Sequence, residues 1–290
     1  MKRNLMLAIT LCLCGTSVFA QPRSASEPRK LIEHSVGLMA PVWSPDGSRI
    51  AVTTDNYTGI LVANANGSNL KCITNESGAG YKMKWSDDGT QILGRTNVLE
   101  NNRVLHEIKK WDVATGKADI LVGKSRNIKG TPTWKSVKTV STINKTGVYE
   151  LMVNDPVKAT SKIASLNKYS GKMIINPALS PDGSKVAFQI PGHGMWICDS
   201  NGENLKNIGK GSNPQWLPDN ESIIYTLVSD DGSNFTASDI YSMNVNSGKK
   251  YLLTQNTDLI PLTPSVSPDG QKVAFENAID ASIYVINLKY

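Results

Sequence analysis

Short runs of alternating apolar and polar residues recur along the chain, and each follows a turn rich in Asp, Pro and Gly. The sequence Pro-Val-Trp-Ser-Pro-Asp-Gly at residues 41–47 precedes Arg-Ile-Ala-Val at residues 49–52. Asp-Gly between two β-rich runs is typical of a hairpin turn, because glycine adopts positive φ without steric cost. Each unit is therefore predicted to open with two antiparallel strands. The five turn segments are residues 41–47, 83–89, 177–183, 214–220 and 264–270.

A sixth unit keeps only part of this pattern. Pro132, Thr133 and Trp134 preserve the Pro-x-Trp element, but the Pro-Asp-Gly turn is missing. The repeat has a period in the forties, which is typical of four-stranded propeller blades. A Trp recurs at a fixed position before the turn, and we expect it to pack between adjacent blades. We call the residues at this position of the six units the Trp column; successive members are 37 to 50 residues apart. They are Trp43, Trp85, Trp134, Leu179, Trp216 and Val266.

The last unit ends after its third strand, at Tyr290, and the N-terminal region supplies a candidate for the fourth. Residues 29–33 resemble the fourth strand of the preceding unit at residues 249–253. Pairing there would also protect an exposed sheet edge. The sequence thus predicts an all-β fold, a six-bladed β-propeller of four-stranded blades over residues 21–290, with its last blade closed by the N-terminal strand.

Residues 1–20 have the features of a secretory signal peptide. Lys2 and Arg3 precede an apolar run at residues 5–13, and Val-Phe-Ala at residues 18–20 resembles a cleavage site. The run is too short to span a bilayer. We therefore expect a periplasmic or secreted protein that is not an integral membrane protein; a lipid anchor on Cys14 is left open.

The mature chain is predicted to be mildly basic. The formal net charge is +6, and +4 without the first twenty residues. No run of like charges marks a nucleic-acid-binding stripe, so nucleic acid is not expected as a partner. Cys72 and Cys198 lie about half a ring apart in the repeat, so both are expected to be free, mostly packed thiols. A monomer is expected.

The Trp-Ser-Pro-Asp-Gly…Ile-Ala-Val pattern resembles the TolB-type β-propeller family and also the propeller domains of prolyl oligopeptidase-like enzymes. The resemblance covers nearly all of residues 21–290. It implies a non-catalytic scaffold that binds an envelope protein or peptide. The chain contains no G-x-S-x-G motif, the nucleophile elbow of the peptidases.

The innermost strand of each blade should line the central channel. The six segments expected there contain no Asp, Glu, His or Cys, so we predict no catalytic residue, metal ligand or cofactor. They do contain Lys82, Lys84 and Lys129, which we interpret first as solvated lysines; a weak preference for carboxylate-bearing partners is the alternative. A carbohydrate-binding propeller, or a propeller enzyme of the lyase or lactonase type, remains the alternative. The segments are residues 38–43, 80–85, 129–134, 174–179, 211–216 and 261–266.

Binding on a rigid ring usually involves its variable loops. The aromatic candidates in these loops are Tyr57, His193 and Phe235, which with Lys82 and Lys84 form the predicted binding set. The aspartates of the repeated turns should be structural, because each caps its own hairpin. They are Asp46, Asp88, Asp182, Asp219 and Asp269.

Overall fold

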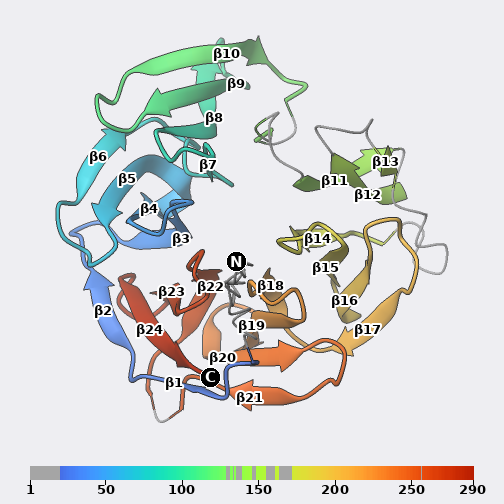
Figure 1. The fold of residues 1–290 in the computed structure, drawn as a ribbon. Helices are drawn as coiled ribbons and strands as arrows, with labels where there is room; N and C mark the ends of the chain where they lie inside the picture. Colours follow the sequence, from blue (N-terminus) through green and yellow to red (C-terminus); the bar gives the residue numbers. More distant parts are fainter. Residues whose placement is uncertain are drawn as a thin grey trace, which may run out of the picture.

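The computed structural model is an all-β, propeller-like ring of antiparallel sheets (Figure 1). It describes residues 20–128, 131–132, 134, 139–145, 148–154, 161–162, 172–255 and 257–290. Of the predicted signal peptide, residues 1–19 lie outside this part of the chain, as does Lys129.

Five sheets have four or five strands. In four of them the strands run in chain order from the centre of the ring outward, and in the fifth the N-terminal strands lie outermost (Figure 1). The predicted hairpin turns join the first two strands of each sheet. The β3–β6 blade contains β3 (Leu38–Trp43), β4 (Arg49–Thr54), β5 (Thr58–Asn64) and β6 (Lys71–Thr74), with the short 3-10 helix η1 (Asp55–Tyr57) between β4 and β5. The β7–β10 blade contains β7 (Lys84–Trp85), β8 (Gln91–Glu100), β9 (Arg103–Asp112) and β10 (Ala118–Ser125).

Three further blades follow along the chain. The β14–β17 blade contains β14 (Ile175–Leu179), β15 (Lys185–Ile190), β16 (Gly194–Asp199) and β17 (Lys206–Gly209). The β18–β21 blade contains β18 (Ser212–Trp216), β19 (Ser222–Asp230), β20 (Phe235–Asn244) and β21 (Lys250–Leu252). The closing blade contains β22 (Pro261–Val266), β23 (Lys272–Asn277) and β24 (Ile283–Lys289), together with the N-terminal strands β1 (Ser24–Ala25) and β2 (Arg29–Ile32).

The unit that lacks the Pro-Asp-Gly turn forms a three-stranded sheet. Its strands are β11 (Thr139–Lys145), β12 (Val148–Asn154) and β13 (Ser161–Lys162). The described residues of its expected first strand, 131, 132 and 134, are not in a strand. The described residues therefore form five complete blades, with three strands in the place of the sixth predicted blade.

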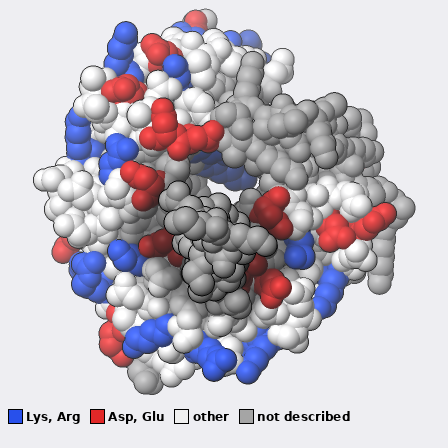
Figure 2. All heavy atoms as spheres, viewed as in Figure 1, with Lys and Arg blue, Asp and Glu red and all other residues white. Residues whose placement is uncertain are grey.

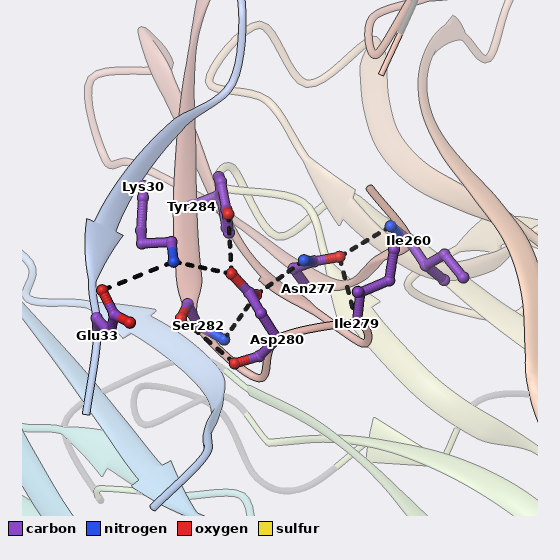
Figure 3. A network of polar contacts seen from close by, with 8 residues as sticks. All are labelled: Lys30, Glu33, Ile260, Asn277, Ile279, Asp280, Ser282 and Tyr284. Atoms are coloured by element: carbon purple, nitrogen blue, oxygen red, sulfur yellow. Dashed lines mark hydrogen bonds and ion pairs between the residues drawn. The ribbon is translucent and has the colours of Figure 1, made fainter. Parts of the chain in front are cut away.

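The N-terminal segment closes the last blade, as the sequence predicts. Both β1 and β2 pair antiparallel with β24, so this blade has five strands rather than the four expected. The side chain of Lys30 on β2 forms an ion pair with Asp280 at 3.0 Å, and the Tyr284 hydroxyl donates to the same carboxylate (Figure 3). Burial alone would raise the pKa of Asp280, but hydrogen bonds from Lys30, Asn277 and Tyr284 lower it to about 2.

The aspartates of the repeated turns have the predicted structural role. The Ser44 hydroxyl donates to Asp46 at 2.5 Å, and Asp46 accepts the Ser48 backbone N–H, while Gly47 adopts φ 69°. These hydrogen bonds lower the pKa of Asp46 to about 2. The same Ser–Asp hydrogen bond, at 2.6 Å, joins Ser86 to Asp88, Ser180 to Asp182 and Ser267 to Asp269; Asp219 accepts the backbone N–H groups of Glu221 and Ser222.

The Trp column packs between blades, which confirms its predicted role. Trp43, Trp85 and Trp216 are 6–7% exposed. Each indole N–H donates to a carbonyl of the neighbouring blade's innermost strand, because a buried N–H needs a partner. The acceptors are Ser265 O for Trp43 at 3.1 Å, Val42 O for Trp85 at 3.1 Å and Ala178 O for Trp216 at 3.0 Å.

Apolar clusters fill the spaces between successive sheets. One joins the closing blade to the β3–β6 blade, and another joins the β3–β6 blade to the β7–β10 blade. Cys198 is buried in the cluster that joins β12 to the β14–β17 blade. Cys72 is exposed on β6, so the prediction that both thiols are packed is wrong for this one. Both are free, as expected. The next residue, Ile73, packs against the β7–β10 blade, and because side chains alternate along a strand, Cys72 points to the opposite face of β6.

Candidate functional site

The innermost strands share a backbone irregularity three residues before the Trp column. At this position Ala40 and Lys82 adopt φ 50°, and Asn213 adopts φ 53°. In the β3–β4 pair, for example, the register shifts between Met39 and Val42. Such bulges bend a strand and re-aim its side chains. The bulge therefore recurs from blade to blade around the centre of the ring, and each bulge directs one residue towards that centre.

A cavity of about 630 Å³ lies at this centre. Figure 2 shows the central opening, with Lys or Arg side chains inside it and acidic side chains around it on the same face. Among the described residues that line the cavity, the charged ones are Lys82 and Lys84, so both predicted lysines are at the channel. The lining residues are Tyr81, Lys82, Met83, Lys84, Thr131, Val140, Ser141, Thr142, Asn176, Pro177 and Gln215.

Lys84 has an unusual electrostatic environment. Its side chain projects from β7 and is half-buried. Burial, followed by the charge of Lys82, lowers the pKa of Lys84 to about 8. Lys82 is exposed, and its Nζ lies 5.6 Å from the ring centroid of Tyr81. A bound anion would therefore relieve the mutual repulsion of two closely placed cations.

Tyr57 joins this site through an aromatic contact. It ends η1, and its ring meets that of Tyr81 edge to face, with the centroids 5.1 Å apart. The Arg95 guanidinium lies 5.0 Å from the centroid of Tyr81. Burial, followed by the charge of Glu276, raises the pKa of Tyr57. Tyr57 therefore lies beside the channel instead of standing alone on a loop.

Two polar side chains at the bulges lie on second strands, so a prediction based on the innermost strands alone does not include them. Glu276, on the second strand of the closing blade, accepts the Ala40 backbone N–H at 2.6 Å. Gln189, on the second strand of its own blade, accepts the Asn213 backbone N–H at 2.9 Å. The sequence carries a signal for this pair, because Lys-Val-Ala-Phe precedes both Gln189 and Glu276.

His193 and Phe235 lie apart from the channel residues, in other blades. Phe235, expected in a loop, is instead the first residue of β20, where it pairs with Asp230 across the β19–β20 hairpin. His193 is exposed in the turn between β15 and β16. Phe235 is 50% exposed and lines a separate cavity of about 400 Å³ with Asp230, Ile260 and Ile279. The structure thus brings together Tyr57, Lys82 and Lys84, but not the complete predicted set.

Within the described residues, no group of three or more His, Cys, Asp or Glu side chains is placed to hold a metal ion. In the same part of the chain, no helix is both long and apolar enough to cross a membrane.

Solved structures share this architecture at low sequence identity. A TolB from Agrobacterium tumefaciens, described as putative, superposes with a TM-score of 0.60 at 15% identity, covering 93% of this chain and 100% of the other. An oligogalacturonate lyase in complex with manganese gives 0.52 at 14% identity, covering 93% and 97%. TolB from Acinetobacter baumannii gives 0.53 at 15% identity, with 88% of this chain matching 64% of that protein. No family model and no curated protein matches the sequence.

At this identity the likeness shows the fold alone. The chain has a β-propeller fold of the kind found in TolB proteins and in an oligogalacturonate lyase.

Proposed function

We propose that this chain is an exported, non-catalytic, TolB-like scaffold that binds a protein or peptide in the cell envelope. Residues 1–20 would be removed as a signal peptide, so the mature protein would be periplasmic or secreted and would comprise residues 21–290. The TolB structures among the fold neighbours support this proposal.

The proposal includes a six-bladed ring in which β11–β13 belong to the sixth blade. Trp134 supports this, because its indole N–H donates to Lys84 O at 3.2 Å. That hydrogen bond repeats the inter-blade contact of Trp43, Trp85 and Trp216. The Trp at this repeat position thus makes the same contact in the unit that lacks the Pro-Asp-Gly turn.

The central cavity is the observation that carries the binding function. It presents Lys82 and Lys84 beside Tyr81, with amide and hydroxyl groups from other units around them. This combination suits an extended peptide segment that bears a carboxylate, because two cations can attract the charge while polar side chains satisfy the peptide groups. The edge-to-face contact of Tyr57 would hold the Tyr81 ring in place.

Capture from an envelope extract tests this function. The immobilised protein is compared with K82A/K84M, which removes both channel cations, and with K117A/K289A, which removes two exposed lysines elsewhere. We expect bound proteins to be lost with the channel variant alone and to be eluted by salt. The same captured set on all three proteins would contradict a channel site.

Phe235 and His193 are tested separately, because they lie in other blades, at the start of β20 and in the β15–β16 turn. The Phe235→Ala and His193→Ala variants keep the channel lysines. If the proposed loop face contributes, each variant should retain less of the captured partner than the unaltered protein. Capture that is unchanged in both would confine binding to the central site.

A second candidate function is a lyase acting on an acidic saccharide. The observation that favours it is Lys84, whose pKa of about 8 leaves part of the amine neutral near physiological pH. A neutral amine can abstract the proton next to a uronic acid carboxylate, while Lys82 stabilises the charge that develops. The glycosidic C–O bond on the adjacent carbon then breaks as the double bond forms, and the departing oxygen takes a proton from water. Incubation with oligogalacturonate tests this by the ultraviolet absorbance of an unsaturated product, which should be absent with Lys84→Met.

A further inference from the structure

A second cavity, of about 400 Å³, lies where the end of the β19–β20 hairpin meets the closing blade. The hairpin contributes Asp230 and Phe235 to its lining, and the closing blade and the segment before β22 contribute Ile279 and Ile260. Phe235 and Ile279 are 50% and 62% exposed. The lining shares no residue with that of the central cavity. Its volume is within the range of ligand pockets, about 300–1,000 Å³.

The hairpin places an aromatic ring beside a carboxylate. Asp230 and Phe235 face each other across the antiparallel β19–β20 pair. Directly facing side chains project from the same side of a sheet, with their Cβ atoms about 4.5–5.5 Å apart. Asp230 Oδ1 also accepts the Gly232 backbone N–H at 3.0 Å, which holds the carboxylate at the hairpin end. The ring and the carboxylate are therefore presented together to one cavity.

Hydrogen bonds fix the opposite, aliphatic wall. Asn277 Oδ1 accepts the Ile260 backbone N–H at 2.9 Å, and Asn277 Nδ2 donates to Asp280 at 2.8 Å (Figure 3). Lys30 forms an ion pair with Asp280, so this neighbouring carboxylate already has a counter-ion. The Ile260 and Ile279 side of the cavity is thus tied to the strand that closes the ring.

The charge of the cavity indicates which ligand fits it. Among the described lining residues the charged one is Asp230, and no residue of the described chain forms an ion pair with it. A neutral ligand that covered the cavity would bury this carboxylate without a counter-ion, which is unfavourable. The ligand should therefore carry a cation, and an apolar stem that can pack against Ile260 and Ile279.

We propose that this cavity binds an arginine side chain of a partner protein or peptide. A guanidinium group is planar, so it can lie over the Phe235 ring and donate two parallel hydrogen bonds to Asp230. Its methylene stem would pack against the isoleucines while the charged end meets the carboxylate. A lysine ammonium is a point charge that lacks this planar fit. The proposal deepens the loop-face part of the proposed function and does not depend on the channel lysines.

Peptides that differ at one side chain test the ligand. The probes are end-capped Gly-Ala-X-Ala-Gly peptides in which X is arginine, lysine or citrulline, the last being an uncharged analogue of arginine. Binding is followed by NMR of ¹³C-labelled isoleucine δ1 methyl groups, because Ile260 and Ile279 line the cavity. The arginine peptide should shift both signals. Lysine should bind at least about threefold more weakly, and citrulline at least about tenfold more weakly.

Two substitutions test the site itself. Asp230→Asn keeps an acceptor for the Gly232 N–H but removes the charge, and should weaken binding of the arginine peptide at least about tenfold. Phe235→Leu keeps an apolar side chain but removes the ring, and should weaken it about threefold. Asp119→Asn is the matched control, because it removes an exposed carboxylate from β10 in another blade. Thermal unfolding checks that each variant is folded.

The channel variant K82A/K84M separates this site from the central one. It should bind the arginine peptide as the unaltered protein does, so loss of the channel function would leave this proposal standing. Methyl signals of Ile260 and Ile279 that do not move with the arginine peptide overturn the proposal. So does unchanged binding by Asp230→Asn, or a citrulline peptide that binds equally well. Equal affinity for the lysine peptide would overturn the assignment to arginine.

Discussion

The carboxylate of Glu276 accepts the backbone N–H of Ala40 at 2.6 Å, and this hydrogen bond crosses the boundary between the closing blade and the β3–β6 blade. Gln189 makes the equivalent bond to Asn213 between two other blades. At these two bulges a backbone N–H is turned towards the preceding blade. A side chain on that blade's second strand accepts this N–H, so these two bulges contribute to holding neighbouring blades together.

Replacing Glu276 with Gln should stabilise the protein at neutral pH. Burial raises the pKa of Glu276, so the folded state disfavours the charged form. Stability is therefore lost as the pH rises from the group's ordinary pKa of 4.5 through its raised value in the folded protein. Gln keeps the acceptor, as Gln189 does. Urea unfolding should show E276Q to be more stable at pH 7, with the difference disappearing below about pH 4.

Glu276→Ala provides the control for this prediction. It removes the acceptor and leaves the Ala40 N–H without its partner, at a cost of about 1–3 kcal/mol. If E276Q and E276A are destabilised equally, the hydrogen bond to Ala40 is not what the side chain contributes.

Two substitutions in the Trp column distinguish the contribution of indole packing to stability from that of the indole hydrogen bond. Trp85→Phe keeps an aromatic ring between the blades but removes the donor to Val42 O, which should cost about 1 kcal/mol. Trp85→Ala also empties the space and should cost about 3–5 kcal/mol. Both values are measured by denaturant unfolding. Equal losses in the two variants would mean that packing of the ring contributes little.

Lys84 should make stability and anion binding depend on pH in opposite directions. Its pKa is lowered to about 8 from 10.5, so protonation is disfavoured in the folded state. Stability relative to Lys84→Met should therefore rise as the pH increases from about 8 to 10.5. Binding of an acidic peptide should weaken over the start of the same range, because the amine loses its charge.

Calorimetry in buffers of different ionisation enthalpy checks the binding half of this prediction. A bound carboxylate favours the protonated amine, so binding near pH 8 should take up protons. Lys84→Met should abolish the uptake, whereas Lys117→Met, on an exposed turn, should leave it intact. Proton uptake that persists in Lys84→Met would assign the titration to another group.

The two described cysteines should differ sharply in reactivity. Cys72 is exposed, whereas Cys198 is buried and burial raises the pKa of its thiol to about 12. The thiolate is the reactive form, so a maleimide should label Cys72 in the native protein and Cys198 only after unfolding. Peptide mapping by mass spectrometry distinguishes the sites. Native labelling of Cys198 at the rate of Cys72 would show that the β12 to β14–β17 cluster opens readily.

Local sequence determined the hairpins, the inter-blade Trp column and the N-terminal closing strand. Each depends on a short-range rule that a linear pattern expresses: Asp-Gly turn chemistry, alternation of side chains, and a repeat that ends one strand short. The sequence also placed Lys82 and Lys84 at the channel, because position within a repeat fixes distance from the ring axis.

Apart from the closing strand, which the repeat itself implies, contacts between side chains of different blades were decided only by the tertiary structure. Tyr57 and Tyr81 belong to successive blades, and Glu276 reaches Ala40 across almost the whole length of the sequence. Whether a thiol such as Cys72 is covered depends on the neighbouring blade, and the lowered pKa of Lys84 depends on burial. Desolvation and side-chain contacts arise from packing in three dimensions, which a linear pattern of residues does not contain.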